Sequence, residues 1–299
     1  MNHLSLTASY STHQLGRWDL IADIASNQWC AAQPHLIMPK VQVEAQIISS
    51  SVKNKNIAKP QHKLTLNYVI TLPQPTTVPK LTRHNLTKHH IEHKYNHISP
   101  AITPWFMWLP LVDEMNPKDK QADFLWQSTC LECFIAGDTS DKQATDAQQY
   151  IEINVASSGH YAIYHFDDYR TPNMMPPRCL ISLPKIQKYL QSDSQNSNQN
   201  SLSNPPDLLT VTTVDDEVIN NAFTTNKMVF GRTVSIDLSP LMQIWHCLTL
   251  IHPTVILQHQ HSQQLLYFAP KHTNPADFHQ QQLWSNIDFL LGSIEHSSL

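Results

Sequence analysis

Two glutamates, Glu132 and Glu152, lie in runs of alternating side chains and are the residues best suited to chemistry. Side chains on a strand alternate between its two faces, so the first run places Trp126 and Glu132 on one face. The second run places Glu152 and Asn154 together, opposite three β-branched residues. If the two strands form a hairpin, Glu132 lies near Glu152 or Asn154.

Aromatic and polar groups on one sheet face are typical of a sugar-binding site. An aromatic ring stacks on the apolar face of a pyranose, while carboxylates, amides and guanidinium groups bind its hydroxyls. The sequence therefore predicts a ligand site on this face. Its candidate residues are Trp126, Glu132, Glu152, Asn154, Tyr169 and Arg170.

Other interpretations of the same residues stay open. Glu132 and Glu152 could act as a retaining glycosidase pair, which needs carboxyl groups about 5 Å apart, one of them protonated. Both glutamates could instead lie on a solvated face, with Trp126 at the edge of the core. A third possibility is a scaffold or partner-binding sandwich with no small ligand. A deep cleft with a raised pKa favours catalysis, and a shallow aromatic platform favours binding. We expect a non-catalytic protein.

Period-two alternation recurs through the chain and predicts an all-β protein, an antiparallel sandwich. The face formed by Ile151, Ile153 and Val155 should be buried in a central strand. Short helices are expected at 19–31, at 183–191 and after Pro275. The other expected strands begin near 41, 64, 106, 126, 161, 208, 228, 255 and 265.

Polar segments interrupt this pattern. We expect one sandwich domain over 37–290, preceded by an N-terminal segment, 1–36, that contains a short helix. Flexible insertions are expected at 73–104, which is rich in proline and histidine, and at 191–206, which is nearly devoid of apolar residues.

Composition limits the partners. With 20 basic and 24 acidic residues the net charge is −4, so nucleic acid is not an expected partner. No secretory signal is recognised at the start, the five cysteines follow no disulfide pattern, and the apolar stretch 241–257 is broken by Pro253 and histidines. We therefore expect a cytoplasmic protein that binds no membrane. Its oligomeric state is left open.

The 18 histidines raise the question of a metal site. His89, His93 and His97 are spaced by four residues, as on one helix face, and His259 and His261 by two, as on one strand face. Such spacings arise by chance in a histidine-rich chain, so exposed histidines are the favoured interpretation and no metal is expected.

Four sequence runs, two of which contain the strands described above, follow one another along the chain. They are 125–134 (LWQSTCLECF), 150–159 (YIEINVASSG), 164–170 (YHFDDYR) and 267–279 (YFAPKHTNPADFH). In this order they resemble motifs of bacterial DOMON-like domains related to family nine carbohydrate-binding modules. The resemblance implies a DOMON-like, jelly-roll-like sandwich and adds His272 and His279, from the closing motif, to the ligand site. The chain departs from the family at Ile151, where an aromatic residue is usual.

The same resemblance extends to haem in the wider superfamily. Haem needs a strong axial ligand, commonly His or Met, in an apolar pocket. Met174, Met175, His272 and His279 are available, but no spacing selects among them. We therefore expect a small molecule, a sugar before haem, and no cofactor.

Overall fold

A computed structural model describes residues 8–33, 36–52, 61–73, 121–138, 149–156, 158–196, 208–213 and 227–291. Most of them lie in antiparallel strands, which confirms the expected all-β class. The strands are β1 (Ala8–Ala22), β2 (Lys40–Val52), β3 (Gln61–Pro73), β4 (Cys130–Asp138), β5 (Tyr150–Ala156), β6 (Tyr161–Phe166), β7 (Leu209–Thr213), β8 (Lys227–Asp237), β9 (Cys247–Gln258), β10 (Leu265–Ala269) and β11 (Ser285–Leu290). The helices are α1 (Ile24–Ala31) and α3 (Pro184–Asn196), with short 3-10 turns η5 (Leu125–Gln127), η6 (Leu180–Ser182), η7 (Leu241–Gln243) and η8 (Gln281–Leu283).

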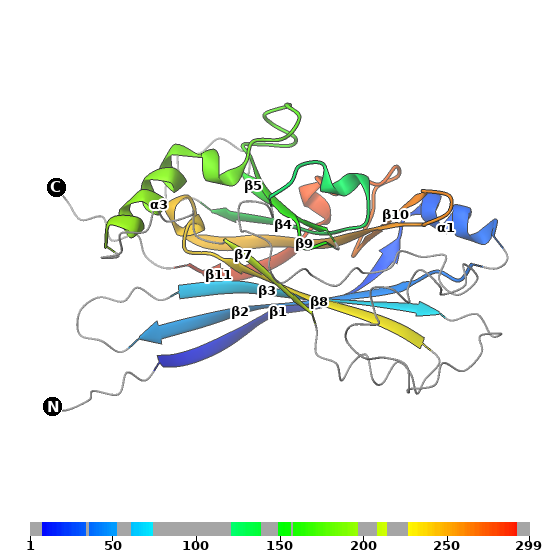
Figure 1. Cartoon of the computed structure of the whole chain (residues 1–299), viewed down its shortest axis with the longest axis horizontal. Coiled ribbons are helices and arrows are strands. Elements are labelled where there is room, and N and C mark those ends of the chain that lie inside the picture. Colours follow the sequence, from blue (N-terminus) through cyan, green and yellow to red (C-terminus); the bar gives the residue numbers. More distant parts are fainter. Residues whose placement is uncertain are drawn as a thin grey trace, which may run out of the picture.

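The strands form one curled sheet whose two halves face each other (Figure 1). Sheet A contains β1, β2, β3, β8 and β7, and sheet B contains β10, β9, β4, β5 and β6, with β11 also paired to β9. The halves meet where Ile21 and Ala22 of β1 pair with Ala269 and Phe268 of β10. The long strand β1 therefore belongs to both layers.

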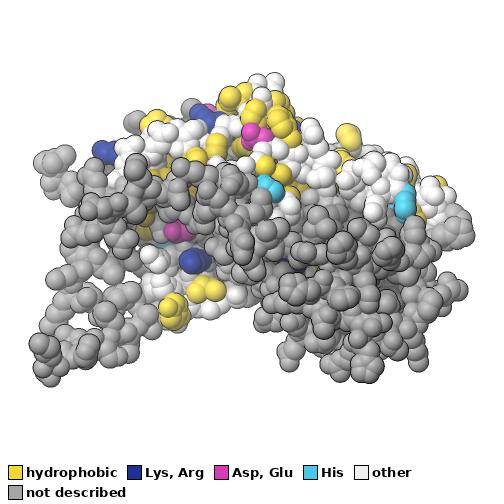
Figure 2. Space-filling view, in the orientation of Figure 1, with side chains coloured by type: hydrophobic (Ala, Val, Ile, Leu, Met, Phe, Trp, Pro, Cys, Tyr) yellow, Lys and Arg dark blue, Asp and Glu magenta, His cyan; other side chains and the backbone are white. Residues whose placement is uncertain are grey.

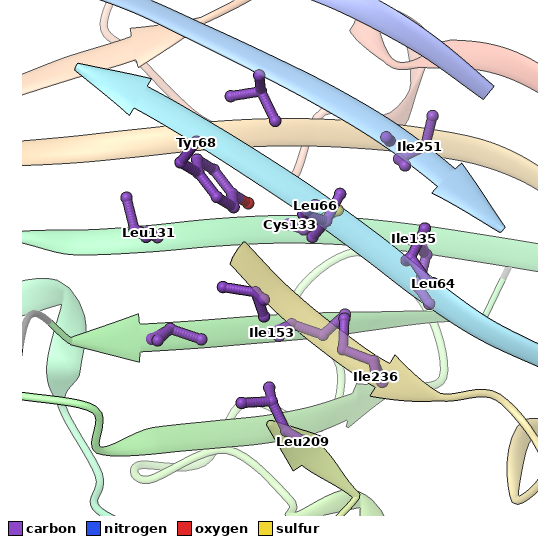
Figure 3. Packing of buried hydrophobic residues seen from close by; sticks show 14 of the residues in the cluster. Leu64, Leu66, Tyr68, Leu131, Cys133, Ile135, Ile153, Leu209, Ile236 and Ile251 are labelled. Carbon is purple, nitrogen blue, oxygen red and sulfur yellow. The ribbon is translucent and has the colours of Figure 1, made fainter. Parts of the chain in front are cut away.

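The main core fills the space between the two halves. The Tyr68 hydroxyl crosses this space and donates a hydrogen bond of 2.7 Å to the Glu132 backbone carbonyl. Ile151, Ile153 and Val155 are each only 1% exposed and belong to this core, which confirms the predicted face. Figure 3 shows side chains of β3 (Leu64, Leu66 and Tyr68) close to those of β4 (Leu131, Cys133 and Ile135).

The strand β9 lies at the centre of sheet B and pairs with three other strands. One edge pairs with β4 along most of its length, and the remaining pairings are with β11 at residues 247–251 and with β10 at 255–258. The apolar stretch that begins at Leu241 thus becomes a turn and a buried strand. Of the helices in the described ranges, none is long and apolar enough to span a bilayer.

A β-bulge at Ala136 and Gly137 brings β4 close to the start of β9. A Cβ atom added at Gly137 would lie 2.4 Å from the Cys247 carbonyl oxygen and 2.7 Å from the buried Trp245 ring. Gly137→Ala should therefore force the backbone apart and lower the free energy of unfolding by about 1–3 kcal/mol in a urea titration.

Gly16→Ala is the matched control for this prediction, because the three atoms nearest to its Cβ would all belong to the half-buried Trp18 ring and none to the backbone. A smaller loss is expected there. Equal losses in the two variants would contradict the argument that backbone contact makes Gly137 necessary.

Several sequence predictions need correction. The strand expected from Trp126 begins only at Cys130, because Gln127 and Ser128 donate backbone hydrogen bonds to Phe124 and Leu125 and close a 3-10 turn. Residues 191–196, expected in a flexible insertion, instead extend α3. The strand β1 was not foreseen at all. The strand expected near 106, most of 73–104 and residues 197–206 lie outside the described residues.

Candidate functional site

A pocket lies on the outer face of sheet B, the face turned away from the main core. Its cavity measures about 270 Å³. The sheet contributes the floor, and three segments form the sides: η5, the loop 170–177 and the segment 276–279. The lining residues are Trp126, Glu132, Phe134, Glu152, Phe166, Arg170, Pro172, Asn173, Met174, Met175, Pro177, Ile256, Tyr267, Ala276, Asp277, Phe278 and His279.

Strand alternation explains why these side chains share one face. On β4, Cys130, Glu132 and Phe134 point outward while their neighbours enter the main core. On β5 the same is true of Glu152 and Asn154. A second hydrophobic cluster, which includes Tyr150, Phe166, Phe278 and Trp284, covers this face. The face is therefore buried beneath loops, which contradicts the interpretation that its glutamates are solvated.

The two glutamates lie as diagonal neighbours in the floor. Glu132 pairs directly with Asn154, and Glu152 is two residues from Asn154 on the same face. Asn154 donates a 2.7 Å hydrogen bond to Glu152 Oε1, and Thr254 donates one of 3.2 Å to Glu132 Oε2. Only 2% of Glu132 and 5% of Glu152 is exposed.

Burial changes the acidity of both carboxyl groups. Loss of solvation raises the pKa of Glu152 to about 7. It raises the pKa of Glu132 well above its usual value, and repulsion from Glu152 adds to this effect. At neutral pH the pair therefore holds at least one proton.

His279 sits between the floor and the rim of the pocket. The Tyr150 hydroxyl accepts from the Arg170 backbone N–H at 3.0 Å and is hydrogen-bonded to His279 Nδ1 at 2.7 Å. The other ring nitrogen, Nε2, lies 3.7 Å from Glu152 Oε2. Burial lowers the pKa of His279 to about 3, so the imidazole is neutral at physiological pH.

The rim is held by Asp277. Its carboxylate accepts hydrogen bonds from Arg170 at 3.0 Å, from the Tyr169 hydroxyl at 2.6 Å and from Gln280 at 2.9 Å. These donors outweigh desolvation and lower the pKa of Asp277 to about 2. Figure 2 shows hydrophobic side chains gathered at the top of the molecule. Met174 and Met175, which line the pocket, are exposed.

Of the eight residues predicted for the site, five line the pocket: Trp126, Glu132, Glu152, Arg170 and His279. Asn154 and Tyr169 support the lining residues Glu152 and Asp277 by hydrogen bonds. His272 does not line the pocket, because its Nε2 donates to the Ile21 carbonyl at 2.8 Å. Trp126 reaches the pocket from η5, with its ring 5.8 Å from that of Tyr164.

Sequence reasoning missed several residues of the pocket. Phe134 could have been found, because it follows Glu132 by two residues in an alternating run. Asp277 and Phe278 adjoin His279 in the closing motif. Tyr267 opens the same closing motif and reaches the pocket from β10, whereas no local pattern marks Ile256 of β9.

The geometry of the histidines bears on the haem and metal alternatives. His279 Nδ1 is hydrogen-bonded to the Tyr150 hydroxyl, and His272 Nε2 donates to the Ile21 carbonyl. Neither of these two nitrogens is therefore available as a ligand for haem iron or another metal. His259 and His261 lie in the turn after β9, not on one strand face. In the described part of the chain no three His, Cys, Asp or Glu side chains are grouped to hold a metal. His89, His93 and His97 lie outside that part.

Comparison of the chain with protein-family models, with curated proteins and with solved structures found no match.

Proposed function

We propose that the protein binds a small polar ligand of the carbohydrate class in the pocket on sheet B, without transforming it. The observation that carries the proposal is a pair of buried carboxyl groups at the floor of a cavity with aromatic walls. Concave sites with apolar walls and a few convergent polar groups are typical of small-ligand binding. The size of the cavity suits a ligand as small as one sugar ring.

The protonation of the floor also favours hydroxyl recognition. A protonated carboxyl group donates one hydrogen bond and accepts others, so it matches a sugar hydroxyl in both roles. Trp126 at the side and Phe166 in the floor line the cavity, and aromatic rings of this kind stack on the apolar side of a pyranose. The resemblance of the four sequence runs to carbohydrate-binding modules agrees with this proposal.

A second candidate is glycoside hydrolysis by Glu132 and Glu152. The observation in its favour is the adjacent pair of carboxyl groups with raised pKa values. A retaining enzyme, however, needs one ionised nucleophile beside one protonated acid. At neutral pH Glu152, whose pKa is about 7, is only partly ionised beside the protonated Glu132, so the nucleophile is weak and binding is placed first; the hydrolysis assay described below decides between the two functions.

A glycan-array screen followed by calorimetry tests the proposal. Trp126→Ala should weaken the affinity for the best ligand at least tenfold, because an aromatic platform is a common energetic anchor. Trp29→Ala, in the half-buried face of α1 away from the pocket, is the matched control and should bind normally. Equal affinity of Trp126→Ala and wild type would contradict the site.

Hydrolysis assays separate the two candidates. Glu132→Gln and Glu152→Gln should weaken binding only modestly, because the amide oxygen still accepts hydrogen bonds. If the wild type hydrolyses a glycoside and either variant loses turnover while still binding, the protein is an enzyme.

A further inference from the structure

The floor of the pocket contains two acidic groups whose hydrogen-bonding partners are neutral. Glu132 interacts with the Thr254 hydroxyl and the Cys130 thiol, and Glu152 with the Asn154 amide. Among the described residues, no lysine or arginine forms an ion pair with either carboxyl group. A buried carboxylate without a cation in contact is costly. The charge of Arg170 acts on Glu152 only from a distance and does not prevent the rise of its pKa.

The two nearest basic groups do not fill this role. Arg170 lines the pocket, but its guanidinium is 3.0 Å from Asp277, which takes up its charge at the rim. His279 Nε2 is 3.7 Å from Glu152, but burial keeps the imidazole neutral. Because Arg170 is paired with Asp277, each proton that the Glu132–Glu152 pair loses leaves a negative charge at the floor with no cation in contact.

The walls suit a cation as well. Phe134 and Phe166 flank the glutamates on neighbouring strands, and Trp126 and Tyr267 also border the cavity. Aromatic faces attract cations through the ring quadrupole, most strongly where water is excluded. Aromatic rings beside buried carboxylates form a common environment for an ammonium group.

We infer that the ligand carries a protonated amino group, which binds between Glu132 and Glu152, so that the ligand class is an amino sugar or a similar hydroxylated amine. This inference rests on the proposed small-ligand function and specifies its chemistry. The ammonium donates to both carboxyl groups, and its positive charge favours release to solvent of the proton that the free pair retains. The ring hydroxyls of the ligand would then form hydrogen bonds with rim residues such as Arg170 and Asp277.

The affinity for such a ligand should depend on pH. Because the pKa of Glu152 is about 7, the pair gains negative charge between pH 5.5 and 7.5, and amine binding should strengthen over this window. The titratable groups around the pair change charge outside this pH window. Burial raises the pKa of each neighbouring thiol and phenol and lowers the pKa of each neighbouring histidine, and the pKa of Asp277 is about 2. These neighbours are Cys130, Tyr150, Tyr164, Tyr267, His252, His279 and Asp277.

Two pairs of probes test the inference by calorimetry: glucosamine with glucose, and trans-4-aminocyclohexanol with trans-cyclohexane-1,4-diol. Each pair exchanges a hydroxyl for an amino group at nearly constant shape. The cyclohexyl amine, an alkylamine like lysine, stays protonated over the whole window. At pH 7.5 the amine of each pair should bind at least tenfold more tightly, and for the cyclohexyl pair this preference should shrink towards pH 5.5.

Matched variants localise the effect. In the double variant Glu132→Gln and Glu152→Gln, the diol should still bind, but the amine should no longer bind more tightly than the diol. Glu44→Gln, on an exposed position of β2, should keep it.

The outcomes distinguish the inference from the function it rests on. Neutral probes that bind as tightly as amines, with an affinity that Trp126→Ala weakens, would overturn the amine and leave the proposed function intact. An amine preference that survives in the double variant would also overturn the inference. If none of the four probes binds, both the amine inference and the proposed carbohydrate-binding function are contradicted.

Discussion

Ile153→Ala should lower the free energy of unfolding by about 2–5 kcal/mol, the usual cost of truncating a buried isoleucine. Ile153 is 1% exposed at the centre of β5, which is paired on both sides, with Cys133 of β4 and with Ile163 of β6. A cavity at this point cannot close easily because both neighbouring strands hold the backbone in place. Chemical denaturation monitored by tryptophan fluorescence measures the change.

Ile21→Ala provides the matched control, because Ile21 also lies in a strand but is 56% exposed. Its loss should stay within about 0.5 kcal/mol, as for most surface substitutions. Similar losses at the two positions would show that the burial of the β5 core face does not determine the cost.

Glu152→Gln should stabilise the protein increasingly as pH rises. The folded-state pKa of about 7 lies above the ordinary value of 4.5, so between these values the folded state binds more protons than the unfolded state. Wild-type stability from this group is therefore highest below pH 4.5 and declines up to about pH 7. The variant lacks this decline and should gain roughly 3 kcal/mol over wild type between pH 4.5 and 8.

Urea denaturation at several pH values measures this difference. The neutral histidines contribute the opposite dependence, since their lowered pKa values reduce stability as pH falls below about 6.5, but they are present in both proteins and cancel. Glu44→Gln should show no such gain. A constant difference between Glu152→Gln and wild type would mean that Glu152 is solvated.

The fold was predictable where alternation is strong. The bounds of β5 and β6 agree with the expected runs, because each alternates between a core face and a covered outer face. The strand β1 was not predicted, because its polar outer side and Gly16 weaken the period-two alternation of its sequence. Its extended conformation is stabilised by pairing with β2 along most of its length. The end of α3 was missed because composition alone favoured a loop over 191–196.

The site was predictable in its floor and only partly in its walls. Alternation placed Glu132, Glu152 and Asn154 on one face, and this needs only the period of the strand. Trp126 borders the pocket for a different reason from the one expected, since it projects from η5. What sequence could not show is that the segments 170–177 and 276–279 fold over this face and turn a polar surface into a buried one.

The junction between β1 and β10 has a consequence for how the chain acquires its structure. The Tyr267 N–H donates to Ser26 Oγ across 241 residues of sequence, and Thr254 donates to Glu132 across 122. Contacts this distant in sequence make folding slow, because a long loop must close before they form. During synthesis β4 remains an open edge until β9 has left the ribosome. The outer face that carries Glu132 and Glu152 therefore cannot be covered until the segment 276–279 has been made.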